Sequence, residues 1–218
     1  MIIEVPDQKT IIDLTLLATI FQGVGEGIYS IAKMSEHAID PRTREVFTAI
    51  IPLIENGSKF SDALASCEDM YWSSPLFLGY IRFGEEKVEG LAPAIIELRN
   101  LLDISEQLKY SMKIEARNAV LLALFAGLLE IEVDITEIFN FASIAIKDDD
   151  INTKSKFASV AGDLRTGITL ANCPAIAEVF GKEIAGMWAI GEASGLLNEI
   201  LFEAATWQAR IVDTTIVF

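Results

Sequence analysis

The sequence predicts an all-α protein made of two tandem repeated helical bundles that are related by a pseudo-two-fold axis. Three observations predict this fold class. Apolar residues recur at the three-and-four spacing of a buried helix face, strand-like alternation with turn dipeptides is absent, and one arrangement of residues occurs twice along the chain. We place the first bundle at residues 10–112 and the second at residues 113–212, with about six helices in each.

The repeat is carried by blocks of sequence that recur in the same order. Residues 17–26 align with residues 121–130, and residues 40–57 align with residues 150–167. The positions that coincide are Leu17/Leu121, Ile20/Leu124, Phe21/Phe125, Gly23/Gly127, Glu26/Glu130, Asp40/Asp150, Thr43/Thr153, Arg44/Lys154, Phe47/Phe157, Ile54/Leu164 and Gly57/Gly167. A third block, which opens on Gly-Glu, follows in both copies. Duplication of one domain is the simplest explanation.

Each copy opens with an apolar helix. In the first copy, residues 14–31 are expected to form one helix, because their apolar residues keep a helical spacing: Leu14, Leu17, Phe21, Val24, Ile28 and Ile31. In the second copy, apolar residues cover most of the circumference of helix 118–131: Val120, Leu121, Leu122, Leu124, Phe125, Leu128 and Leu129. A helix that is apolar nearly all round is buried on more than one side. We therefore expect these two helices to form the contact between the copies.

A capped helix follows in each copy. Asp40 can accept hydrogen bonds from the free N–H groups of a helix start, and Pro41 in the first turn has no N–H to leave unpaired. Gly57 is expected to end this helix in the left-handed conformation of a C-terminal cap. Asp150 and Gly167 bracket the matching helix of the second copy in the same way.

A long helix closes each copy, and a Gly-Glu motif stands before it. The motif reads GEEKVEGL from residue 84 and GEASGL from residue 191. The apolar stripes of the two helices are Leu91, Ile95 and Leu98 in the first copy and Leu196, Ile200, Leu201 and Ala204 in the second. The candidate site residues, for partner binding or for structure, are Gly84, Glu85, Gly90, Gly191, Glu192, Ser194 and Gly195.

The motif has a functional and a structural interpretation. In the first, Glu85 and Glu192 contact a partner or a cation, or act together as paired acid–base carboxylates. In the second, the glycines let a loop backbone pass close to a helix, and each glutamate accepts hydrogen bonds from N–H groups at a helix start. We favour the structural interpretation, because a motif kept in both copies serves what the copies share, which is the fold.

The charge and hydropathy of the chain argue against several partners. Its 218 residues carry a net charge of −15, and such a field repels nucleic-acid phosphates and anionic lipid head groups. The longest apolar run, residues 119–129, is shorter than the ~20 residues of a membrane span. The N-terminal residues lack the basic and apolar regions of a signal peptide. We expect a cytoplasmic protein with no nucleic-acid partner and no direct membrane insertion.

Signatures of enzymes and cofactor sites are missing from the sequence. His37 is the only histidine, Cys67 and Cys173 have no ligand spacing, and the glycine-rich residues 21–27 lie in a helical pattern rather than after a strand. The acidic run 148–150 lacks the glutamate and glycine of a calcium loop, so we expect a solvated helix start there. The tryptophans are expected in the core: Trp72, Trp188 and Trp207. These observations predict a protein that is not an enzyme and has no cofactor or metal.

The order of these motifs resembles the cytoplasmic domain of the type II secretion system F protein, also called the type IV pilus inner-membrane platform protein. The stretch GEASGL is the strong match, whereas GEEKVEGL has two extra residues and lacks the serine. The resemblance covers residues 14–207. Members of this family carry two such domains, each followed by membrane-spanning helices, and no such segment separates the two copies here. The chain is therefore expected to be a soluble tandem of F domains.

The resemblance implies a scaffold rather than a catalyst. Cytoplasmic domains of this family hold together the assembly ATPase and other inner-membrane components of a secretion or pilus machine. We expect this chain to bind that ATPase or another machine subunit, either in the cytoplasm or at the inner membrane through a partner. The alternative is a small-ligand or metal-binding regulatory module that has reused the fold, for which a pocket with convergent polar groups is the expected sign.

Overall fold

The computed structural model describes residues 3, 5–111, 113–147 and 150–214. Within these residues every regular element is a helix and no strand occurs, which confirms the all-α prediction. The chain divides into two compact units, which are described separately: the first unit is Pro6–Leu102, and the second unit is Asp103–Phe218 with Met1–Val5. The division falls within a helix, Leu91–Leu108, about ten residues before the expected boundary at 112/113.

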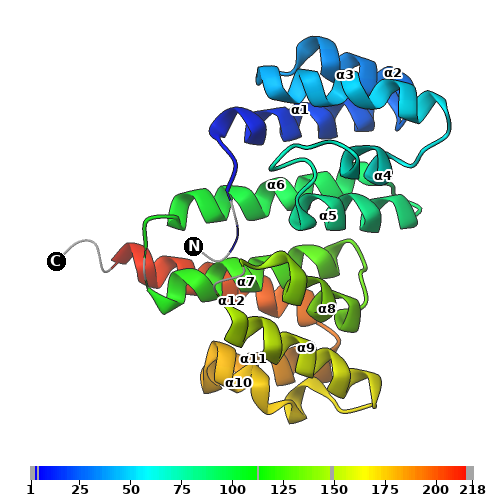
Figure 1. The fold of residues 1–218 in the computed structure, drawn as a ribbon. Helices are drawn as coiled ribbons and strands as arrows, with labels where there is room; N and C mark the ends of the chain where they lie inside the picture. Colours follow the sequence, from blue (N-terminus) through cyan, green and yellow to red (C-terminus); the bar gives the residue numbers. More distant parts are fainter. Residues whose placement is uncertain (1–2, 4, 112, 148–149, 215–218) are drawn as a thin grey trace. The chain divides into compact units, whose positions relative to one another are not determined.

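The first unit contains six helices in chain order around one core (Figure 1). They are α1 (Gln8–Val24), α2 (Ile28–His37), α3 (Pro41–Glu55), α4 (Phe60–Ala65), α5 (Pro75–Glu86) and α6 (Leu91–Leu108), of which the last extends beyond the unit. Aromatic rings fill the core in edge-on and tilted contacts, and the set is Phe21, Phe47, Phe60, Trp72 and Phe77. The indole N–H of Trp72 donates a hydrogen bond to Thr43 Oγ1 at 3.2 Å, which satisfies its one buried polar atom.

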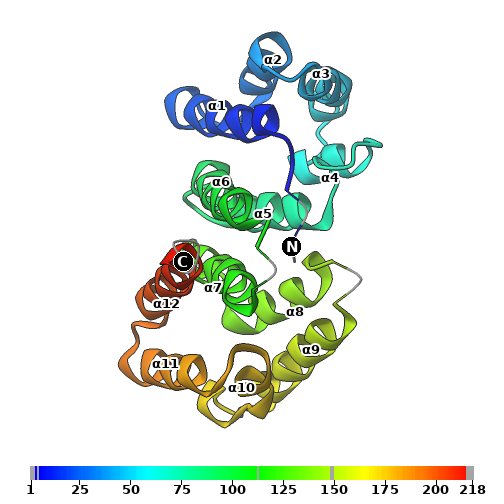
Figure 2. The same cartoon turned by 90° about the vertical axis from the view of Figure 1, so that its left-hand side faces the viewer.

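The second unit closes its helices into a ring. It contains α7 (Ile114–Glu130), α8 (Ile135–Ala145), α9 (Ile151–Arg165), the 3₁₀ helix η1 (Leu170–Asn172), α10 (Pro174–Phe180), α11 (Lys182–Ser194) and α12 (Leu197–Thr214). Figure 2 shows these helices following one another around a shared core, and α12 returns to pack against α7. The ring encloses a second aromatic cluster: Phe125, Phe139, Phe157, Phe180 and Trp188.

The prediction of one continuous helix over residues 14–31 is wrong. The chain forms α1 and α2 instead, with a break at residues 25–27. Gly25 has φ +91°, and Gly27 is fully extended with φ −168°, so helical hydrogen bonding stops there. Val24 and Ile28, expected on the buried face, are 58% and 38% exposed. The apolar spacing continues across the break because α1 and α2 each have an apolar face of their own.

The predicted helix ends of α3 and α9 are confirmed. Gly57 and Gly167 both have φ +86°, the left-handed conformation that side-chain-bearing residues rarely adopt. The N–H of Gly57 donates to the carbonyl of Ile54 at 2.9 Å, and the N–H of Gly167 donates to the carbonyl of Leu164 at 3.0 Å. These hydrogen bonds satisfy carbonyl groups that the helix itself leaves free. The two units therefore end α3 and α9 by the same kind of cap.

The burial of α7 follows the sequence pattern, whereas one tryptophan departs from it. Every residue from Ala119 to Leu128 is buried, which confirms that this helix is covered on all sides. Trp72 and Trp188 are buried as expected, but Trp207 on α12 is 42% exposed. No helix within the described residues is both long enough and apolar enough to cross a membrane.

Candidate functional site

The Gly-Glu motif lies at the junction between two helices in each unit. Gly84 and Glu85 belong to the last turn of α5, and Gly191 and Glu192 belong to the last turns of α11. The expectation that these glycines lie in a loop is therefore wrong, since both are helical. The next glycine supplies the turn that follows. Gly90 precedes α6 with φ +79°, and Gly195 ends α11 in the left-handed conformation with φ +73°.

The helical glycines of the motif allow two helices to approach closely. A Cβ atom on Gly84 would lie 3.0 Å from the Leu91 Cα and 3.0 Å from the Ala94 Cβ on α6. A Cβ atom on Gly191 would lie 2.9 Å from the Cα of Leu197, the first residue of α12. Distances this short between a side chain and a backbone carbon require the backbone to shift. Glycine at these positions therefore sets how near the closing helix lies in each unit.

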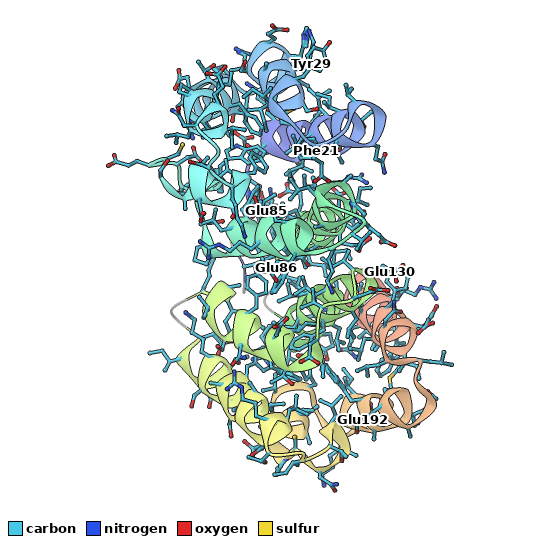
Figure 3. All side chains as sticks on the ribbon, turned by 90° about the vertical axis from the view of Figure 1, so that its right-hand side faces the viewer. Phe21, Tyr29, Glu85, Glu86, Glu130 and Glu192 are labelled. Atoms are coloured by element: carbon cyan, nitrogen blue, oxygen red, sulfur yellow. The ribbon has the colours of Figure 1, made fainter. Side chains whose placement is uncertain are left out.

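The motif glutamates cap short helices in their own units (Figure 3). Glu85 is half-buried and accepts from the backbone N–H of Ser61 at 3.0 Å and from its hydroxyl at 2.6 Å, at the start of α4. Glu192 accepts from the N–H groups of Leu170 at 2.9 Å and Ala171 at 3.2 Å, at the start of η1. The hydrogen bonds are those that the structural interpretation predicts, because free N–H groups at a helix start favour an anion.

A second pair of glutamates, which the sequence alignment matched without assigning a role, binds the closing helices. Glu26 accepts from the N–H groups of Leu91 and, at 3.3 Å, Ala92, at the start of α6. Glu130 accepts from the side-chain amide of Asn198, the second residue of α12. A Cβ atom on Gly90 would meet only the Glu26 carboxylate, the end of a flexible side chain, so it is the positive φ that favours glycine there. The alignment of Glu26 with Glu130 was the available signal.

Ser194 has a local role in the structure. Its hydroxyl donates to the carbonyl of Gly191 at 3.3 Å, one turn back along α11, and the residue is exposed. The backbone N–H of Leu196 donates to the same carbonyl at 3.1 Å. Ser194 therefore helps to satisfy the end of α11.

Side chains of opposite charge contact the start of α3 and the start of α9. An aspartate does so in the first unit and an arginine in the second. The carboxylate of Asp13, buried on α1, accepts from the N–H groups of Ile39 at 2.6 Å and Asp40 at 3.0 Å. Extending the first alignment block along the helices pairs Asp13 with Arg117 on α7. Arg117 Nη1 lies 3.7 Å from Asp150 Oδ2 at the start of α9. Burial lowers the pKa of Arg117, and the charge of Asp150 opposes that shift.

The remaining candidates have ordinary surroundings. His37 is exposed at the end of α2, with its Nε2 3.5 Å from Glu36 Oε2. Burial raises the pKa of the Cys67 and Cys173 thiols, which keeps them protonated and weakens them as nucleophiles and metal ligands. In the part of the chain that the structure describes, no three His, Cys, Asp or Glu side chains are grouped to hold a metal ion. Asp148 and Asp149 lie outside the described residues, and Asp150 caps α9 by accepting from the Thr153 N–H at 3.2 Å.

Replacing Glu192 with alanine is expected to lower the free energy of unfolding by about 0.5–2 kcal/mol, because the N–H groups of Leu170 and Ala171 lose their acceptor. Urea denaturation followed by circular dichroism measures the change. Glu203→Ala is the matched control, since Glu203 is exposed on α12, and its effect is expected to stay within about 0.5 kcal/mol. Equal effects of the two substitutions would show that the Glu192 cap contributes nothing.

Comparison of the sequence with family models and with curated proteins found no match. A family assignment can therefore draw only on the residues of the Gly-Glu motif and on the order of the repeated blocks.

Proposed function

We propose that the protein is a non-enzymatic scaffold that binds a subunit of a secretion or pilus assembly machine, either its assembly ATPase or another inner-membrane component. The resemblance of the repeated blocks to the cytoplasmic F domain suggests this class of partner. The hydrogen bonds of the motif support a scaffold, because Glu85 and Glu192 are engaged with helix starts in their own units. These carboxylates stabilise the fold of each unit, so we assign partner recognition to other surfaces.

The observation that carries the proposal is an apolar surface at the break between α1 and α2. We call this surface the elbow, and it consists of Val24, Ile28 and Tyr29, which are 58%, 38% and 58% exposed. Lys33 Nζ lies 5.4 Å from the centroid of the Tyr29 ring, in cation–π range. Adjacent exposed apolar side chains with a charged neighbour are typical of protein–protein contacts, in which tyrosine is enriched. A net charge of −15 suits a partner with a basic face around an apolar centre.

The test is direct binding of the purified chain to the purified assembly ATPase of the same organism, and to the other inner-membrane subunits in detergent. Val24→Ser combined with Tyr29→Ala is expected to weaken binding by about tenfold or more without changing Tm. Ile151→Ser is the control, since Ile151 is 72% exposed on α9 in the other unit. A chain that binds none of these subunits contradicts the scaffold. Binding that the double variant leaves unchanged excludes the elbow as the contact.

We further propose that the two copies are related by a pseudo-two-fold axis and meet through α1 and α7. The common devices of the two units support a shared ancestor: the left-handed glycines after α3 and α9, and the glutamate caps of α4 and η1. Joining two copies in one chain raises their effective concentration to about the millimolar range, which favours an internal contact. Separately expressed copies that are monomeric and as stable as the whole chain would contradict this arrangement.

A further inference from the structure

The second unit contains a cavity that none of the predicted motifs uses. Its volume is about 670 Å³, within the range of small-molecule sites. The walls come from the start of α7, the junction of α10 with α11, and the last turns of α12, which Figure 1 labels. The lining residues that matter here are Arg117, Asn118, Lys182, Glu183, Trp207 and Gln208.

Buried polar atoms in this cavity lack partners. Asn118 is only 4% exposed, and its Nδ2 donates to the carbonyl of Phe180 at 3.4 Å, whereas its Oδ1 accepts no hydrogen bond from the described residues. Arg117 Nε is likewise buried without an acceptor, although its terminal nitrogens are engaged. Gln208 is 5% exposed. Buried polar atoms are usually hydrogen-bonded, so an orphaned acceptor in the wall of a cavity indicates a missing donor.

The fold itself does not require an amide at this position. The alignment that pairs Asp13 with Arg117 also pairs Leu14 with Asn118, and Leu14 is fully buried in the first unit. An apolar side chain of nearly the same size therefore fills the equivalent place. Burying an unsatisfied amide instead of leucine is unfavourable for folding. The Nδ2 group of Asn118 satisfies the carbonyl of Phe180, whereas no contact within the described residues accounts for its Oδ1.

The start of α11 supplies a place for a negative group beside this amide. Gly181, the N-cap residue, has no side chain to accept from the first N–H groups of this 13-residue helix. In the first unit the corresponding helix, α5, is capped by Ser74 Oγ, which accepts from the Phe77 N–H at 3.3 Å. The Asn118 amide is bonded to the carbonyl of Phe180, the residue just before Gly181, so it lies next to these free N–H groups. Free N–H groups and the helix dipole favour a carboxylate.

We propose that this cavity binds a zwitterionic small molecule of the α-amino acid class. Its carboxylate binds at the start of α11 near Lys182, and its ammonium group donates to Asn118 Oδ1, with the acidic rim residue Glu183 favouring that positive charge. The apolar part of the molecule lies against Trp207 and Ile211, and Trp207 is 42% exposed. The site goes beyond the scaffold function and lies in a different unit from the elbow.

The experiment is titration of the full chain with each of the common L-amino acids, followed by the shift in Tm and by isothermal titration calorimetry. At least one amino acid is expected to raise Tm in a concentration-dependent way. The corresponding amine without its carboxylate, the corresponding acid without its amine, and inorganic phosphate are expected to give no comparable shift. A panel in which no amino acid binds overturns the proposal, and so does an equal response to phosphate or to either truncated analogue.

Two variants test the residues themselves. Asn118→Leu, which introduces the leucine of the other copy, is expected to raise the Kd of the bound amino acid about 10–100-fold. The same variant without ligand is expected to keep the far-UV circular dichroism spectrum of the parent chain, which separates lost binding from lost folding. Gln208→Leu is expected to weaken binding by a smaller factor. Unchanged affinity in Asn118→Leu overturns the assignment of the ammonium contact, and with it the proposal.

Discussion

Replacing Phe125 with alanine is expected to lower the free energy of unfolding by about 3–5 kcal/mol, the largest effect of any single substitution considered for this chain. Phe125 is fully buried on α7 and lies at the centre of the aromatic cluster of the second unit. Its ring centroid is 4.6 Å from that of Phe139, 5.1 Å from Trp188 and 5.5 Å from Phe157. Alanine would leave a cavity among rigid rings that cannot collapse into it.

Chemical denaturation monitored by far-UV circular dichroism measures this loss. Phe202→Ala is the matched control, because Phe202 is 58% exposed on α12, and its change is expected to stay within about 0.5 kcal/mol. A loss for Phe125→Ala below about 1 kcal/mol would mean that the second unit lacks the packed cluster described above.

Replacing Gly191 with alanine is expected to cost about 1–3 kcal/mol, even though alanine is the better helix former. The new methyl group would lie 2.9 Å from the Leu197 Cα, and a backbone atom cannot turn aside as a flexible side chain can. The junction between α11 and α12 must open to admit it. Tm is expected to fall by roughly 2–4 °C for each kcal/mol lost.

Gly186→Ala, on the same helix, is expected to have the opposite effect on the free energy of unfolding. Gly186 lies in the interior of α11 with open space where its Cβ would stand. Alanine there is expected to stabilise the protein by about 0.5–1 kcal/mol, because it restricts the unfolded chain and suits a helix. Thermal denaturation of both variants makes the comparison. Stabilisation by Gly191→Ala would refute the close helix approach.

Features fixed by local chemistry could be predicted from the sequence. An aspartate followed by proline begins a helix, and a glycine after the last turn ends one, because neighbouring backbone groups alone determine these outcomes. Asp40 and Gly57 occupy the places that this chemistry predicts, as do Asp150 and Gly167. The sequence also predicted that the glutamates cap helix starts. It could not identify their partners, Ser61 and Leu170, because these lie more than twenty residues away and are brought close only by the tertiary fold.

The break between α1 and α2 was missed because apolar spacing alone cannot distinguish one long helix from two. Three glycines at positions 23, 25 and 27 were the local signal, yet isolated glycines are tolerated inside helices. The deciding contact is distant: Glu26, placed by the break, binds the start of α6 sixty-five residues later. The Asn118 cavity was missed for the same reason, since four separate helices build it. Its one trace in the sequence is a polar residue at the position that the alignment pairs with Leu14.

The opposite charges at Asp13 and Arg117 bear on how two neighbouring all-helical units avoid exchanging segments while they fold. Similar neighbouring domains are prone to exchange segments, which traps misassembled species. If α1 took the place of α7, Asp13 would stand where Arg117 stands, and Asp150 would lose the cation that lies 3.7 Å from its carboxylate. In the reverse exchange, Arg117 would meet the N–H donors of Ile39 and Asp40, which need an acceptor. The side chain at this position of α1 or α7 therefore matches the groups it faces in its own unit and not those in the other unit. This difference disfavours the exchanged arrangement.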